Sequence, residues 1–330
     1  MSQTAGRPLT EAVLERVAAR GAFPLLRMGF EWPVNRYWIR HAPDELLGEL
    51  PSIEVFEREN CDCIITIDAP ANVRQGSDLP AERFAAWRSA LRPYTDRVMR
   101  HEIPWVVCQH PTPALAQAAG MTLAQFEEFF YGAVLIDWDA LERQMEAVAE
   151  RFDAADRVRI VAEGTDLTLS IAGRRGRVSG ARTNMPSGEV FYSPIEESAE
   201  GVVTFSEFPA CYQGHEVEGV NLRFESGRVV KASATSDEPF LLAMLDTDEG
   251  ARGLGELGIG CNPGIAIHTR NTLFDEKMAG TIHLAIGQSY EDLGGTNRSA
   301  VHWDMVKDLR GNGRIELDGE VVQERGEWRL

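Results

Sequence analysis

The sequence predicts two domains of different class: an α/β domain with a parallel sheet over residues 1–155, and a β-rich domain of the α+β kind over residues 156–330. Three observations support this prediction. A chain of 330 residues is long for one compact domain and comfortable for two. The first half alternates short apolar runs with amphipathic segments, which is typical of a parallel sheet. From residue 157 onward, apolar and polar residues alternate between turn residues, which is typical of antiparallel strands.

Helices and strands alternate in the first half. The segment LTEAVLERVAARG predicts a helix, with Thr10 as its N-cap and Gly21 just past its end. Apolar runs bounded by turn residues predict buried strands at 23–30, 63–70 and 104–111. Further helical segments lie at 42–60, 79–102, 121–133 and 138–155. Pro93 is expected to interrupt the second of these, because proline removes a helical hydrogen bond.

The second half is rich in strands and turns. RVRIVAEGTDLTLSIAGR predicts a hairpin, because EGTD forms a turn between two alternating runs. Further strands are predicted at 189–194, 201–208, 220–234, 280–287 and 313–330. One helical segment, EPFLLAMLDTDEGARG, breaks this series. A mostly β domain is therefore expected here.

The composition argues against several classes of protein. Lys and Arg number 33 against 51 Asp and Glu, a formal net charge of −18, whereas nucleic-acid binding needs clustered positive charge. No apolar run is long enough for a membrane span, and the polar N-terminus lacks the apolar core of a signal peptide. The five cysteines have neither disulfide-framework nor zinc-site spacing. We therefore expect a reduced, cytoplasmic protein with no nucleic-acid or membrane partner.

The stretch SAVHWDMV, residues 299–306, places two ionisable side chains in an apolar run. On a β-strand His302 and Asp304 project to the same face, because residues two apart do so. Burying such groups is costly unless they are paired or bind a metal. A further histidine, His283, lies in a second apolar run, TIHLAIG. Taken singly, each histidine is more often a satisfied core residue than a ligand.

Two acids lie in similarly unusual surroundings. Glu189 follows a Pro-Ser-Gly turn at the entrance to a strand, and Glu256 lies among glycines and leucines in GLGELGIG. Either could simply be exposed on the wet face of a strand. With Asp304 and the two histidines they form a set of oxygen and imidazole ligands that suits a pair of divalent ions such as Zn, Co or Mn. Tyr290, seven residues after His283, could donate a hydrogen bond to an oxyanion.

The order of five motifs resembles a known family. MPSGEVFYSP, GRVVKASA, DEGARGLGELGIG, NTLFDEKMAGTIHLAIGQSY and HWDMV follow one another as in the M29 metallo-aminopeptidases of the aminopeptidase T type. The resemblance covers residues 155–306 with specific motifs and the first half only loosely. The chain departs from the family pattern where D-E-N-A reads DEKM and where S-P-I reads CNPGI.

The resemblance implies a function and a set of site residues. It implies a homodimeric exopeptidase that removes N-terminal residues from peptides, with two divalent metal ions held in the β-rich domain. Water acidified by both ions would attack the scissile carbonyl, and Tyr290 is implied to assist. His268, close to the site in sequence, could line the pocket. The implied metal ligands are Glu189, Glu256, His283, His302 and Asp304.

Two alternative functions stay open. His283, His302 and Asp304 alone form the two-histidine, one-carboxylate set of a mononuclear non-haem Fe(II) oxygenase. Ring-cleaving dioxygenases of dihydroxypyridines are similar to this family, and the substrate would then be a small aromatic molecule. A site that binds metal or ligand without catalysis is the other alternative, although no ligand position is missing. In the peptidase, the carboxylate that moves the proton could be Glu196, Glu197, Asp275 or Glu276.

Overall fold

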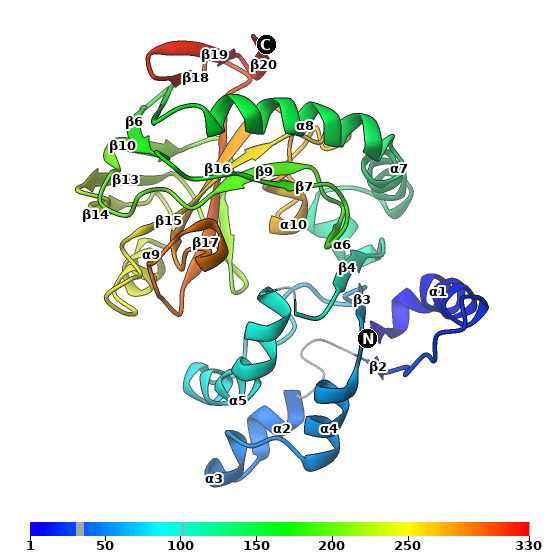
Figure 1. Ribbon diagram of the computed structural model, residues 1–330. Coiled ribbons are helices and arrows are strands. Elements are labelled where there is room, and N and C mark those ends of the chain that lie inside the picture. The colour runs from blue at the N-terminus through cyan, green and yellow to red at the C-terminus, as the bar shows by residue number, and fades with distance from the viewer. Residues whose placement is uncertain (31–35, 101, 330) are drawn as a thin grey trace. The chain divides into compact units, whose positions relative to one another are not determined.

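The chain forms two compact units. The computed structural model describes residues 1–30, 36–100 and 102–329 (Figure 1). The first unit contains Met1–Glu127 and Arg182–Met185, and the second contains Glu128–Ala181 and Pro186–Leu330. A parallel sheet lies in the first unit and antiparallel sheets lie in the second. This mixture confirms the predicted fold class.

The first unit is built on a five-stranded parallel sheet. The strand order is β2-β1-β3-β4-β8, and neighbouring strands run parallel. The strands are β1 (Ser2–Gln3), β2 (Met28–Gly29), β3 (Ile64–Asp68), β4 (Trp105–Gln109) and β8 (Asn184–Met185). Two of the predicted runs therefore form strands. The run at 23–30 contributes only two residues, because its apolar side chains, such as Phe23 and Leu25, are exposed and burial does not stabilise a longer strand.

Helices alternate with these strands along the chain. They are η1 (Thr4–Gly6), α1 (Arg7–Ala19), α2 (Arg36–His41), α3 (Asp44–Leu47), α4 (Ser52–Asn60), α5 (Ala81–Met99), α6 (Pro113–Ala118) and α7 (Leu123–Val134), the last of which runs into the second unit. Two of them, α2 and α6, lie outside the segments predicted to be helical. The predicted N-cap is wrong. Thr10 lies inside α1, where its hydroxyl donates to the carbonyl of Gly6 at 2.8 Å, because the helix already begins at Arg7.

The predicted interruption at Pro93 is also wrong, since α5 continues through it. Trp87 and Leu91 of this helix are buried in a small cluster with Ile39 and Leu47. Packing of that face outweighs the one backbone hydrogen bond that proline removes. Position 101, within the predicted helix at 79–102, lies outside the described residues. Among the helices that the structure describes, none has both the length and the apolar character needed to cross a membrane.

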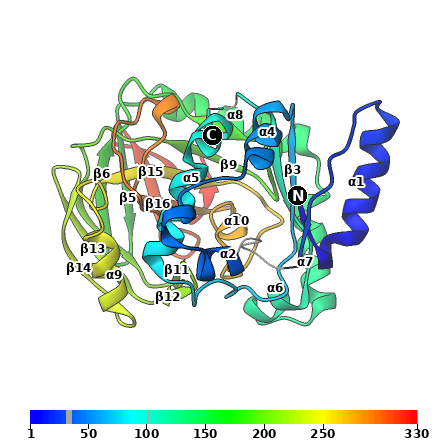
Figure 2. The ribbon, with the colours of Figure 1, turned by 90° about the horizontal axis from the view of Figure 1, so that it is seen from below.

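The second unit contains two large antiparallel sheets and one hairpin, as Figures 1 and 2 show. The eight-stranded sheet has the order β14-β13-β10-β6-β5-β18-β19-β20, the five-stranded sheet has the order β17-β16-β15-β9-β7, and β11 pairs with β12. The strands are β5 (Arg157–Ala162), β6 (Thr165–Ser170), β7 (Arg177–Ser179), β9 (Glu189–Tyr192), β10 (Glu200–Phe205), β11 (Ala210–Tyr212), β12 (His215–Val217), β13 (Val220–Glu225), β14 (Arg228–Ser233), β15 (Leu254–Gly260), β16 (Thr281–Gly287), β17 (His302–Asp308), β18 (Arg314–Leu317), β19 (Glu320–Glu324) and β20 (Glu327–Trp328). The helices are α8 (Trp138–Asp153), α9 (Glu238–Leu245), α10 (Thr272–Asp275) and η2 (Glu291–Leu293).

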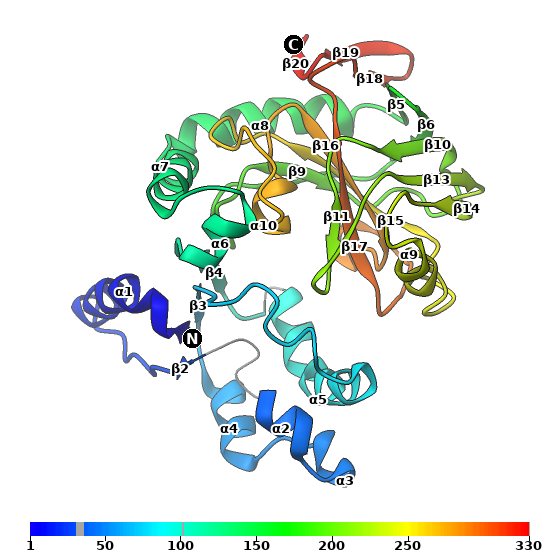
Figure 3. The same ribbon diagram turned by 180° about the vertical axis from the view of Figure 1, so that it is seen from behind.

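One hydrophobic cluster joins α8 to both large sheets. Met145 and Phe152 of α8 are fully buried in it, together with Leu167 of the eight-stranded sheet and Trp303 of the five-stranded sheet. Figure 3, which is the view from behind, shows α8 running along the sheets. The five-stranded sheet therefore uses one face for the core and has the other face available for polar side chains.

Candidate metal centre

Alternation along β17 separates core residues from candidate site residues. Trp303 and Met305 are buried in the hydrophobic cluster, whereas His302 and Asp304 alternate with them and point to the opposite face. On the neighbouring strand β16, His283 alternates in the same way with core leucine and isoleucine residues. The ionisable residues of the two strands therefore share the face away from the core.

The strand register brings four strands to this face. Ala285 of β16 lies opposite Glu256 of β15 on one side and opposite Asp304 of β17 on the other. At the next step along the sheet, Gly260 of β15 lies opposite Glu189 of β9. All five residues that the sequence pattern singled out as ligands thus come from adjacent strands of one sheet.

A β-bulge in β15 aims Glu256 at the site. Leu254 lies opposite Ile286, but Glu256 lies opposite Ala285, so Gly255 is an extra residue in β15. Strict alternation would turn Leu254 and Glu256 to the same face. The bulge instead keeps the leucine in the core while the glutamate faces the site. Glycine is required here, because an added Cβ would lie 2.5 Å from two backbone carbonyl oxygens.

Backbone carbonyls orient both histidines in the same way. The Nδ1 of His283 donates to the carbonyl of Glu276 at 3.0 Å, and the Nδ1 of His302 donates to the carbonyl of Gln288 at 2.7 Å. Because a carbonyl oxygen only accepts, Nε2 is the ring atom left to face the carboxylates. Metal-binding histidines are commonly held like this. Gly258 makes room for the His283 ring, since an added Cβ would lie 1.8 Å from its Cε1.

The two Nε2 atoms meet the carboxylates at the centre of this face. Glu256 contacts both histidines, with Oε2 at 3.1 Å from Nε2 of His302 and Oε1 at 3.3 Å from Nε2 of His283. Asp304 Oδ1 lies 3.6 Å from the same atom of His302 and 4.0 Å from that of His283. Glu189 Oε2 lies 3.7 Å from Nε2 of His283. Glu256 and Asp304 therefore both contact the two histidines, and Glu256 makes the shorter contacts.

In the part of the chain that the structure describes, the potential ligand atoms form two groups, and the atoms of each group lie within 4.8 Å of one another. One group is Glu256, His302 and Asp304, and the other is Glu189, Glu276 and His283. Lys277 joins the second group, with Nζ 3.2 Å from Glu189 Oε1 and a closer ion pair with Glu276. Sequence reasoning considered Glu276 only as a proton carrier and gave Lys277 no role. The signal in the sequence that could have indicated their role is that these two charged residues come shortly before the apolar strand β16.

Burial and mutual charge shift the pKa values of the group. Burial acts to raise the pKa of Glu256, but hydrogen bonds from both histidines lower it to about 2. Burial raises the pKa of Glu189 to about 7 and that of Asp304 to about 6. Burial acts to lower the pKa of His283 and His302, but the carboxylates around them raise it to about 10. The carboxylates thus favour positive charge at the centre of the site.

The donor set fits divalent metal ions. Among the described residues, Glu189 Oε2 and Asp304 Oδ1 are buried without a hydrogen-bond partner. A buried acceptor without a partner costs free energy, whereas a carboxylate oxygen facing an imidazole Nε2 is suited to bind a cation. Carboxylate and imidazole ligands together suit zinc and similar first-row ions.

Tyr290 borders the ligand groups. Its ring packs edge-on against His302, with centroids 5.5 Å apart, and at a tilt against Phe191, with centroids 5.1 Å apart. Burial, followed by the charges of Glu256 and Asp304, raises its pKa well above the usual value. The phenol therefore stays protonated and is able to donate a hydrogen bond.

The structure separates the other candidate residues. Of the four acids considered as proton carriers, only Glu276 belongs to a ligand group in the described part of the chain. Asp275 is buried and accepts a hydrogen bond from a backbone amide at 2.6 Å, and it lies 3.1 Å from Nε2 of His268. Glu196 is held by an arginine and a threonine, and Glu197 is exposed. Asp275 and His268 therefore face each other.

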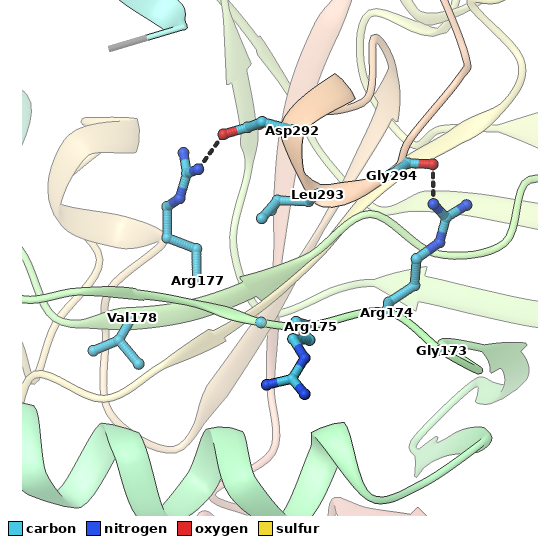
Figure 4. Close-up of a pocket in the computed structure, with 9 residues that line it drawn as sticks. Gly173, Arg174, Arg175, Arg177, Val178, Asp292, Leu293 and Gly294 are labelled. Atoms are coloured by element: carbon cyan, nitrogen blue, oxygen red, sulfur yellow. Dashed lines mark hydrogen bonds and ion pairs between the residues drawn. The ribbon is translucent and has the colours of Figure 1, made fainter.

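A pocket of about 580 Å³ lies beside the loop that follows the tyrosine, lined by residues 173–178 and 292–294 (Figure 4). Arg177 forms an ion pair with Asp292, and Arg174 donates to a backbone carbonyl of the second segment. Both arginines thus tie the strand segment to the loop. We interpret these contacts as structural, because they hold the segment that follows the tyrosine.

The sequence matches known aminopeptidases and a family of metalloproteases. The pattern of the family described as thermophilic metalloprotease (M29) matches residues 1–328. Aminopeptidase T from Thermus aquaticus is 31% identical over 308 residues, which cover 76% of this chain and 72% of that protein. The resemblance drawn from the five motifs is therefore confirmed, and the match extends over the first half as well.

Two solved structures are similar in fold. Wild-type AmpT from Thermus thermophilus matches with a TM-score of 0.84 and 26% identity, over 100% of this chain and 93% of that chain. The 2,5-dihydroxypyridine dioxygenase from Pseudomonas putida KT2440 matches with a TM-score of 0.52 and 14% identity, over 86% of this chain and 96% of that chain. The second likeness concerns the fold alone.

Proposed function

Because the chain belongs to the M29 family of thermophilic metalloproteases, we propose that it is a metal-dependent aminopeptidase that hydrolyses the N-terminal residue from peptides. The observation that carries the proposal is the convergence of two oriented histidines, two buried glutamates and the half-buried Asp304 on one face of a sheet. The dioxygenase alternative is supported only by a distant likeness in fold.

Two divalent ions, Zn, Co or Mn, are the proposed cofactors. The ligands would be Glu189, Glu256, His283, His302 and Asp304. Glu256 contacts both histidines and is proposed to serve both ions. Two bound ions supply a water of lowered pKa and polarise a carbonyl oxygen. All five ligands lie within residues 156–330, which supports the metal-binding role proposed for that part of the chain.

We propose catalytic roles for two further residues, Tyr290 and Glu276. Tyr290 keeps its proton and borders His302, so it would donate a hydrogen bond to the developing oxyanion. Glu276, the one proton-carrier candidate in a ligand group of the described chain, would move a proton from the attacking water to the leaving amine.

The test measures metal content and hydrolysis together. We expect close to two Zn, Co or Mn ions per chain by elemental analysis, together with hydrolysis of aminoacyl p-nitroanilides. His302→Ala should lose both. The matched control is His215→Ala, because His215 also pairs with an aspartate, at 2.7 Å, but lies outside the ligand groups. One iron per chain with oxygen uptake on dihydroxypyridine would instead establish the alternative.

We also propose a cytoplasmic homodimer without nucleic-acid or membrane partners. The cytoplasmic location is supported by five cysteines that form no disulfide. The net charge of −18 argues against binding to nucleic acid. The dimer is proposed by resemblance to the family. Light scattering of the purified chain would give twice the 36.6 kDa monomer mass if it is correct.

A further inference from the structure

Lys277 is a fully buried lysine whose ammonium group lies against one of the two ligand groups. Its side chain has 0% exposure, and its Nζ lies between Glu189 and Glu276. A lysine is rarely buried this deeply unless carboxylates surround its ammonium group. No step proposed above for this site uses a fixed positive charge.

The contacts of Glu189 show what the lysine does to this group. Its Oε1 lies 3.2 Å from Nζ of Lys277, while its Oε2 faces His283 at 3.7 Å and accepts no hydrogen bond among the described residues. The two oxygens of the Glu189 carboxylate thus face different groups, the ammonium of Lys277 and the ring nitrogen of His283. A metal ion that binds Glu189 would meet a carboxylate whose charge Lys277 already neutralises. The ion and the ammonium group of Lys277 are both positive, and two buried positive charges a few ångströms apart repel each other strongly.

The other ligand group has no such competitor. Within the described residues, the ion pairs of Glu256 and Asp304 all involve His283 or His302. Each ligand group contains one histidine, so the buried ammonium group of Lys277 is the charge that distinguishes the two groups.

We infer that Lys277 is a built-in competitor of the metal ion at Glu189 and His283, so that the two ions bind with unequal affinity. The ion at Glu256, His302 and Asp304 binds first. The second ion binds only at a higher free metal concentration, because Lys277 must give up part of its contact with Glu189. This inference rests on the proposed function and adds to it that free metal controls the fully loaded state.

The experiment counts Zn²⁺ ions per full-length chain across a series of buffered free Zn²⁺ concentrations. The wild-type chain should fill in two separate steps. Lys277→Met keeps the length of the side chain and removes the charge, and it should lower the concentration for the second step by about 10- to 100-fold, the range by which groups next to metal ligands change affinity. The first step should shift much less.

Lys307→Met is the matched control. Lys307 is equally buried and pairs with Glu207 at 2.7 Å, but it contacts neither ligand group. It should keep the wild-type steps. An unchanged second step in Lys277→Met, or a shift of equal size in both variants, would overturn the inference. If circular dichroism shows that the methionine variant does not fold, Lys277→Gln replaces it. Filling of the wild-type chain in a single step would also contradict the inference. No binding of Zn, Co or Mn to the wild-type chain would instead count against the proposed function.

Discussion

Replacing Gly258 by alanine should remove one metal ion while the sheet stays folded. Gly258 lies directly under the ring of His283 in the neighbouring strand. Its φ is outside the left-handed region, so alanine is compatible with the backbone. The effect of the substitution is therefore confined to the contact between the new methyl group and the imidazole.

The size of the effect follows from the distances. The added Cβ would lie 1.8 Å from Cε1, 2.1 Å from Nε2 and 2.5 Å from Nδ1 of His283. To reach the 3.4 Å at which ordinary contact begins, the ring must withdraw by about 1.6 Å, and it is buried among close-packed neighbours. A zinc–nitrogen bond of about 2.0–2.1 Å does not survive such a movement. We expect about a 100-fold or greater loss of affinity for the ion at His283, and a fall of about 1–3 kcal/mol in the free energy of unfolding from overpacking.

The assay combines an ion count with urea unfolding. Gly258→Ala should bind about one ion per chain, at Glu256, His302 and Asp304, and lose most of its peptidase activity. Gly311→Ala is the control, because an added Cβ there meets nothing within 4 Å. Two ions bound to Gly258→Ala with wild-type affinity would refute the proposed role of His283.

Three further outcomes are expected. Tyr290→Phe should lower kcat by about 10²- to 10³-fold without changing the ion count; a loss of bound metal would show that the tyrosine is structural. The pKa of about 10 for His283 and His302 means that metal uptake releases protons. The raised pKa values of the two histidines and of Glu189 stabilise the metal-free protein most at low pH, and this stabilisation is lost as pH rises. The Tm of the metal-loaded protein should therefore exceed that of the chelated protein by a growing margin as pH rises from about 6 to 9. A constant difference would contradict that linkage. Finally, restoring free Zn²⁺ to about 100 times its dissociation constant should return about 2.7 kcal/mol to the chelated protein, measured by thermal unfolding, and no shift would argue against a metal site.

Local patterns in the sequence predicted much of the candidate site. The alternation around His302 and Asp304 correctly placed both on one strand face, away from Trp303. The apolar run around His283 correctly predicted a buried strand. The structure brings these residues together with Glu189 and Glu256, while their role as ligands stays a prediction.

Non-local features escaped the sequence reasoning for physical reasons. The bulge at Gly255 exists because of its pairing with β16, and period-two counting within one strand does not reveal it. Lys277 looked like an ordinary charged residue, since only the folded chain places it beside Glu189. Pro93 remained inside a helix because of distant packing partners. In each case the deciding contact is far away in the sequence.

The short strand β8 has a consequence for dividing this protein into fragments. Residues Arg182–Met185 belong to the first unit, where β8 pairs with β4, although the chain on both sides of them belongs to the second unit. The polypeptide therefore crosses between the units three times, and no single cut separates them. A fragment that spans the whole second unit would include β8 without its partner strand β4, and its unpaired backbone groups could pair with another chain. If the second unit is expressed without the first, we therefore expect it to aggregate through β8. Replacing β8 by a loop without strand propensity should prevent this.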